Sequence, residues 1–155
     1  MLFMPAMESK IVPYSKMLAF LKEHDTENAD QHLSNIKVND LLRHLHHLME
    51  AQKPFLESNY SLFLLAHDLS IAPYQLSAFI NKILRQRFND LINYYRISYC
   101  LELMSKSPKD HTKVQELSAL CGYNNRNTFI SAFKKFTNRT PSTYIRQLKK
   151  QVIEG

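Results

Sequence analysis

The amino-acid sequence predicts an all-α protein in which two similar helix-turn-helix units are joined by one long helix. The first reason is that only two of the 155 residues are glycine, one of them the last, whereas sheet proteins need glycine in their turns. The second is that apolar residues recur at helical spacing through most of the chain. The third is a divergent internal repeat, because Ala66 and Ser70 correspond to Ser118 and Gly122 at a constant offset of 52 residues.

Residues 1–36 are predicted to form an N-terminal arm. Its apolar residues have the spacing of a short amphipathic helix, and a polar linker follows. The apolar stretch that opens the chain stops at Pro5 and lacks a basic segment before it, so by itself it is neither a signal peptide nor a membrane span. It can instead be the end of a longer apolar segment, as in a chain cut from a larger protein.

The domain itself is expected from residue 37 to residue 150. Its first helix should end before Pro54, because the residue before a proline disfavours helical geometry. Pro73 falls at the first position of the second helix of the first unit, where a helix tolerates proline. The expected elements are the first helix-turn-helix at about 61–84, the linker helix at about 89–105 and the second helix-turn-helix at about 113–136.

The second unit has the clearer pattern. Gly122 lies in its turn, where a positive φ or a close approach between helices favours glycine. The following helix is expected to pack on the core through Phe129, Phe133 and Phe136. Their spacing indicates a slightly longer turn than in the first unit. Pro141 begins a final helix that can pack back on the core.

Positive charge is concentrated in the C-terminal part of the chain. Residues 1–50 contain five Lys or Arg and seven Asp or Glu, whereas residues 51–155 contain fifteen and seven. Residues 121–155 alone contain seven bases and one acid. This asymmetry favours a polyanionic partner, with nucleic acid first and an anionic membrane second. A basic surface with no polyanionic partner is the alternative.

No residue pattern indicates an enzyme, a metal site or a cofactor. Cys100 and Cys121 fall on apolar helix faces, which is typical of small buried residues rather than of a disulfide or metal site. His44 and His47 are one helical turn apart, but nothing at a suitable spacing completes a metal site, so a plain helix face is favoured. Neither a catalytic set nor a Gly-rich phosphate loop is present in the sequence.

The stretch LSALCGYNNRNTFISAFKKFTNRTPSTYIR, residues 117–146, resembles the DNA-binding domain of the AraC/XylS family of bacterial transcription regulators. The resemblance extends over about residues 38–150 and implies a homeodomain-like fold with two helix-turn-helix subdomains. Ser131 and Ala78 depart from the pattern, since the family often has arginine at both positions. The matching residues are Gly122, Tyr123, Phe129, Phe133, Lys134, Thr140, Pro141 and Tyr144.

The resemblance also implies the partners. They are double-stranded DNA at a promoter or operator and, for an activator, RNA polymerase. The family's sensing domain is missing from this chain, and a homodimer would form through the N-terminal arm or through regions absent from the chain. A cytoplasmic location is expected. Some family members carry the domain after membrane-spanning segments, so tethering to the inner membrane is a further expectation for a longer protein.

Base-reading residues are expected at the start of the second helix of each unit, because that helix enters the major groove. Arginine suits guanine and asparagine suits adenine, and Asn125 is also the expected N-cap. The first unit is poorer in such donors and is expected to add shape and methyl contacts. The candidates are Asn124, Asn125, Arg126, Asn127, Thr128 and Ser131 in the second unit, and Tyr74, Gln75 and Ala78 in the first.

Exposed cations are expected to contact phosphates, which sets position and salt dependence rather than sequence. A linker helix roughly 25 Å long would let the two reading helices reach successive major grooves about 34 Å apart. The alternative is a helical protein-interaction module whose basic face is incidental. The phosphate candidates are Lys82, Arg85, Arg87, Lys134, Lys135, Arg139, Arg146 and Lys149.

Overall fold

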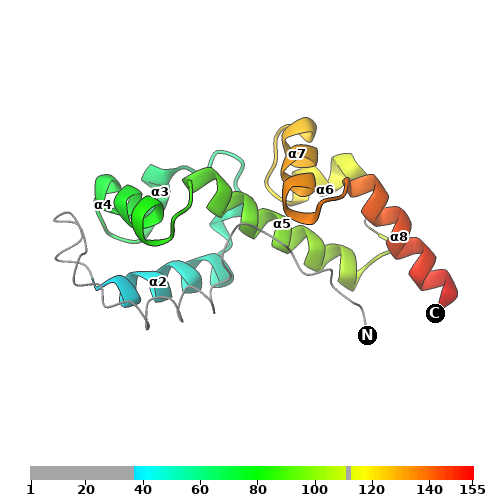
Figure 1. Cartoon of the computed structure of the whole chain (residues 1–155), viewed down its shortest axis with the longest axis horizontal. Coiled ribbons are helices and arrows are strands. Elements are labelled where there is room, and N and C mark those ends of the chain that lie inside the picture. The colour runs from blue at the N-terminus through cyan, green and yellow to red at the C-terminus, as the bar shows by residue number, and fades with distance from the viewer. Residues whose placement is uncertain (1–36, 111–112) are drawn as a thin grey trace. The chain divides into compact units, whose positions relative to one another are not determined.

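The computed structural model describes residues 37–110 and 113–155, and in these residues all regular secondary structure is helical (Figure 1). The predicted arm, residues 1–36, lies outside the described residues. The described chain divides into an N-terminal unit, residues 37–54 and 59–92, and a C-terminal unit, residues 55–58 and 93 onward. The prediction of an all-α fold with two helix-turn-helix motifs is confirmed.

The N-terminal unit is built around the apolar side of its first helix. That helix, α2, buries six apolar residues, as its stripe predicts. Leu65, Leu76 and Phe79 are fully buried and join the next helices to the same core. The elements of this unit are α2 (Val38–Ala51), α3 (Leu62–Asp68), α4 (Pro73–Ala78), its π-helical continuation η3 (Phe79–Ile83) and the start of α5 (Phe88–Lys106).

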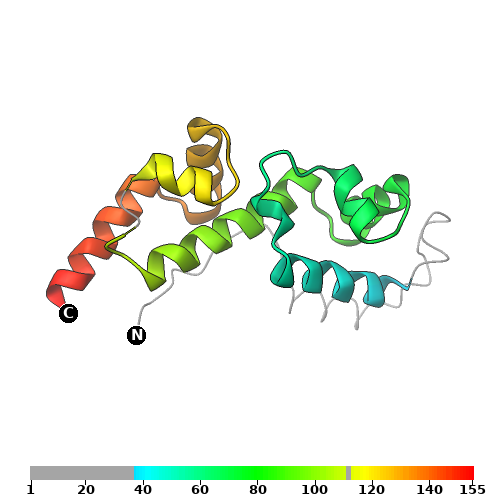
Figure 2. The same ribbon diagram turned by 180° about the vertical axis from the view of Figure 1, so that it is seen from behind.

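The C-terminal unit is organised by a chain of aromatic side chains. The ring centroids of Tyr123 and Phe129 lie 5.3 Å apart, those of Phe129 and Phe133 5.7 Å apart, and those of Phe133 and Tyr144 5.6 Å apart. These contacts join the turn after α6 (Val114–Leu120) to α7 (Arg126–Thr137) and α8 (Pro141–Glu154). The rest of α5, which is one unbroken helix in both views, belongs to the same unit (Figures 1 and 2). The short η2 (Pro54–Leu56) comes earlier in the chain.

The internal repeat is visible in the backbone hydrogen bonds that end α3 and α6. The N–H of Ile71 donates to the carbonyl of Ala66 at 3.0 Å, and the N–H of Tyr123 donates to the carbonyl of Ser118 at 2.9 Å. Each bond closes a Schellman motif around a residue of positive φ, which is 55° at Ser70 and 85° at Gly122. The correspondence predicted from the sequence is therefore confirmed residue by residue.

The turn of the second helix-turn-helix is one residue longer than that of the first. The N-caps of the second helices of the two motifs, Ala72 of α4 and Asn125 of α7, are 53 residues apart rather than 52. Arg85 and Asn138 follow these two helical segments at the same new offset, with φ of 52° and 58°. The longer turn predicted from the phenylalanine spacing is present, and an offset of 53 residues relates α4 to α7.

Candidate nucleic-acid interface

The N-terminal end of α7 presents the predicted base-reading residues to solvent. The helix begins at Arg126, and the side chains from Asn124 to Thr128 are all exposed, as is Ser131. Phe129 is completely buried and anchors the helix to the core directly after these residues. The end of the helix therefore has the arrangement that a major-groove reader requires.

Asn125 has a structural task in this surface. Its Oδ1 accepts a hydrogen bond from the backbone N–H of Thr128 at 3.0 Å, which makes it the N-cap of α7. A bidentate contact to adenine would need both ends of the same amide. In the described part of the chain, no hydrogen bond or ion pair engages the side chains of Arg126 and Asn127. These two side chains therefore remain available for bases.

The first turn of α4 is different. Tyr74 is 60% exposed, whereas Gln75 and Ala78 are half-buried. Gln75 Oε1 accepts a hydrogen bond from the backbone N–H of Ala72 at 3.2 Å, so this predicted base reader caps its own helix.

The eight predicted phosphate contacts are all exposed. Arg139 and Lys135 have neighbours that limit their freedom. Arg139 donates to Gln147 Oε1 at 2.6 Å, and the Lys135 ammonium lies 5.9 Å from the ring centroid of Phe136. The N-terminal unit carries Lys82, Arg85 and Arg87, and the C-terminal unit carries Lys134, Lys135, Arg139, Arg146 and Lys149.

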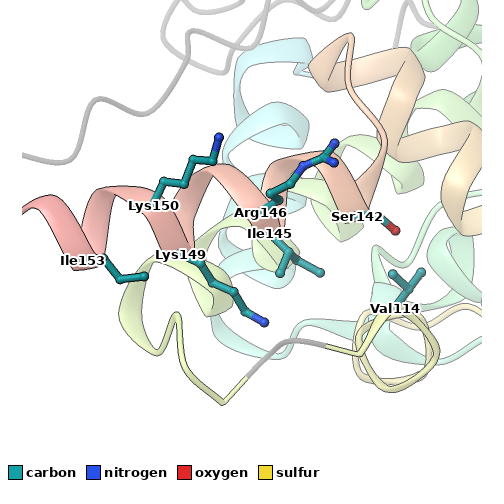
Figure 3. Close-up of a pocket in the computed structure, with 7 residues that line it drawn as sticks. All are labelled: Val114, Ser142, Ile145, Arg146, Lys149, Lys150 and Ile153. Atoms are coloured by element: carbon teal, nitrogen blue, oxygen red, sulfur yellow. The ribbon is translucent and has the colours of Figure 1, made fainter.

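Two of these cations lie beside a cavity of about 380 Å³ along α8 (Figure 3). In this view Ile145 and Lys149 extend to one side of α8, while Arg146 and Lys150 extend to the other. Lys150 is a further cation of this surface that was not predicted, although it follows Arg146 by one helical turn. The lining residues are Val114, Ser142, Ile145, Arg146, Lys149, Lys150 and Ile153.

Arg96 is a buried residue that stabilises the segment next to α7, and it was not predicted from the sequence. It is only 9% exposed, and its guanidinium donates to the carbonyl of Phe55 at 2.6 Å and to that of Glu57 at 2.8 Å. The guanidinium lies 5.1 Å from the ring centroid of Tyr123, and burial lowers the pKa of Arg96. An arginine within a helix usually indicates a surface charge, so no sequence signal marked this position as buried.

Tyr123 is the second member of this buried cluster. Its hydroxyl donates to Asn93 Oδ1 at 2.8 Å, and burial raises its pKa, so the phenol stays protonated and can donate. Tyr123 directly follows Gly122, and its ring contacts Phe129 of α7. The cluster therefore ties the turn of the second helix-turn-helix, and through it the start of α7, to α5.

The described residues contain no group of three His, Cys, Asp or Glu side chains that could hold a metal ion. His44 and His47 are exposed on α2. Cys100 and Cys121 are buried and free, and a hydrogen bond to Cys121 together with burial raises the pKa of the Cys100 thiol. Among the helices of the described ranges, none has the length and apolar character needed to cross a membrane.

The two helix-turn-helix motifs define the class of the protein. A sequence profile of the family described as "Helix-turn-helix domain" matches residues 65–147, more than half of the chain. The chain belongs to this family, the AraC-type helix-turn-helix family of DNA-binding transcription regulators. The interpretation as a protein-interaction module is not favoured.

The relatives agree with this membership. The chain is 27% identical over 158 residues to the HTH-type transcriptional regulator YijO of Escherichia coli K12, covering 90% of this chain and 55% of YijO. The C-terminal domain of AraT, a response regulator from Geobacillus stearothermophilus, is 27% identical, with a TM-score of 0.57 over 69% of this chain and 84% of that one. The C-terminal domain of the response regulator yesN from Fusobacterium nucleatum has the same fold, at 24% identity and a TM-score of 0.55 over 65% of this chain and 93% of that one. The chain thus spans about half of YijO but nearly all of two solved C-terminal domains.

Proposed function

We propose that this chain is the sequence-specific double-stranded DNA-binding part of a bacterial transcription regulator, acting in the cytoplasm where the DNA lies. The observation that carries the proposal is the exposed, uncommitted pair Arg126 and Asn127 at the start of a helix that Phe129 anchors. Guanidinium and amide groups are the side chains that discriminate guanine and adenine in the major groove. Family membership supports the same function.

Within this proposal, different residues read bases, cap the helix and bind phosphates. Arg126 and Asn127 read bases, with Asn124, Thr128 and Ser131 around them, while Asn125 mainly caps the helix. The exposed cations of both units bind phosphates, and Lys150 joins them. Bound together, α4 and α7 would enter successive major grooves of one DNA duplex.

The organisation around the domain is part of the proposal. Residues 1–36 form an arm, residues 37–150 form the DNA-binding domain, and a sensing domain belongs to a longer protein. Since the chain spans about half of YijO, such a region has room in a protein of that size. A homodimer would use the arm or that region, RNA polymerase would be the partner of an activator, and a membrane anchor would precede the arm.

The function is tested by mobility shift with selected and random duplexes at several salt concentrations. We expect the affinity to fall steeply with salt and the selected duplex to be preferred roughly 10³-fold or more at moderate salt. Absence of binding at low salt, or equal affinity for both duplexes at every salt concentration, would contradict the proposal.

Replacing Arg126 by alanine is expected to weaken specific binding by about 1–3 kcal/mol and to relax the preference at one base position. The physical reason is the loss of bidentate hydrogen bonding from the guanidinium to O6 and N7 of guanine. Selection of binding sites by the variant measures the relaxed position, and Arg126→Lys is the matched control that keeps the charge without the planar fork. An unchanged base preference in Arg126→Ala would exclude base reading by this residue.

Lys134 tests the phosphate role. Lys134→Ala should weaken binding to selected and random duplexes by similar factors, and the slope of log affinity against log salt should become shallower by about 0.9. Titrations at four salt concentrations give both values. A loss confined to the selected sequence would instead make Lys134 a base-reading residue.

A further inference from the structure

The reading surface of the N-terminal unit is apolar where that of the C-terminal unit is polar. The offset of 53 residues that relates α4 to α7 pairs Tyr74 with Asn127 and Ala78 with Ser131. Tyr74 lies in the first turn of α4, and its side chain is 60% exposed. The two units therefore offer different chemistry at equivalent positions.

Two polar side chains that follow Tyr74 make hydrogen bonds within the unit. Gln75 Oε1 accepts the backbone N–H of Ala72 at 3.2 Å. Further along, in η3, the Asn81 side-chain amide donates to Ser77 Oγ at 3.2 Å. A bidentate hydrogen bond from Gln75 or Asn81 to a base edge would first require breaking these bonds. The apolar groups on this surface are the Tyr74 ring, on a side chain that is 60% exposed, and the half-buried Ala78 methyl group one helical turn further on.

Among the base edges in the major groove, thymine alone presents a methyl group. We propose that the N-terminal unit recognises thymine through its C5-methyl group, with Tyr74 and Ala78 making the apolar contact. This inference rests on the proposed DNA-binding function and assigns a base to one half of the target. The two half-sites then differ in kind, one read through a methyl group and the other through hydrogen bonds to purine edges.

Deoxyuridine provides the test, because it pairs as thymidine does and lacks only the methyl group. Duplexes are first selected with the full chain, and the positions relaxed by Arg126→Ala identify the half-site of the C-terminal unit. Each thymidine of the selected duplex is then replaced singly by deoxyuridine. We expect one or two replacements, all in the other half-site, to weaken binding by roughly three- to tenfold, in line with the burial of one methyl group.

Variants at Tyr74 assign the effect to this side chain. Tyr74→Ala should bind the thymidine and deoxyuridine duplexes equally, whereas Tyr74→Phe should retain the preference. Arg126→Ala is the control in the other unit, and it should lower affinity for both duplexes while leaving their ratio unchanged. Circular dichroism of each variant checks that the fold is retained, and Tyr74→Phe keeps the test valid if Tyr74→Ala unfolds, because retention of the thymidine preference is a prediction in itself.

Each outcome distinguishes the inference from the function on which it rests. A selected sequence with no sensitivity to deoxyuridine, or sensitivity only in the half-site of Arg126, overturns methyl recognition and leaves the DNA-binding function intact. A thymidine preference that persists in a folded Tyr74→Ala protein overturns the role of Tyr74. Failure to select any sequence overturns the proposed function and this inference with it.

Discussion

Replacement of Gly122 by alanine is expected to lower the free energy of unfolding by about 2–4 kcal/mol, from left-handed strain together with overpacking. Gly122 has a φ of 85°, which side chains rarely adopt. A Cβ built on it would lie 2.6 Å from the carbonyl oxygen of Phe55 and 2.9 Å from that of Leu56. Both atoms belong to the backbone, so no side-chain rotation can relieve the clash.

Ser70 is the matched control, because it occupies the same position of the first helix-turn-helix. It is exposed and has a φ of 55° without being glycine. Ser70→Gly is expected to raise the free energy of unfolding by about 0.5–1 kcal/mol, because the left-handed strain that glycine removes outweighs the larger conformational entropy that glycine loses on folding. Urea denaturation followed by circular dichroism measures both variants. Equal stabilities of Gly122→Ala and the native chain would contradict the close approach seen at this turn.

Loss of the Arg96 side chain is the second large effect that we expect. Arg96→Met retains apolar bulk but leaves the carbonyls of Phe55 and Glu57 without their buried donor. Hydrogen bonds from a charged group contribute about 1.5–3 kcal/mol each, and partial replacement by water reduces the sum, so a loss of about 2–4 kcal/mol is expected. The same urea titration gives the value.

Two variants separate the parts of this cluster. Arg96→Lys keeps the charge but has one nitrogen in place of the two that donate to these carbonyls, so it should lose less than Arg96→Met. Tyr123→Phe removes only the hydroxyl bond to Asn93 and should lose about 1 kcal/mol. If Arg96→Met proved as stable as the native chain, the two carbonyls would have to be satisfied by water, and Arg96 would not tie residues 55–58 to α5.

The candidate site was only partly predictable, and the reasons differ between residues. The exposed position of Arg126 and Asn127 at the start of α7 could be predicted, because the pattern around Gly122 and Phe129 indicates locally where this helix begins. Gln75 was expected to read bases, but its amide caps α4. Whether a polar side chain faces DNA or its own backbone depends on its rotamer, and residue type alone does not specify a rotamer.

By itself the sequence determined the order of the main α-helices and their approximate positions, whereas it did not predict η2 or the π-helical η3. The signals are local: apolar spacing, proline at the first helical position, and the turn residues Ser70 and Gly122. The turns that they predict are closed by hydrogen bonds between residues close in the chain. Only the tertiary structure decided why glycine is required at 122 while serine suffices at 70. The second turn packs against the backbone of residues 55 and 56, which are far away in the chain, whereas Ser70 in the first turn is exposed to solvent. Local periodicity carries no information about such a contact. The same segment also accepts a hydrogen bond from the buried Arg96, at the carbonyl of Phe55.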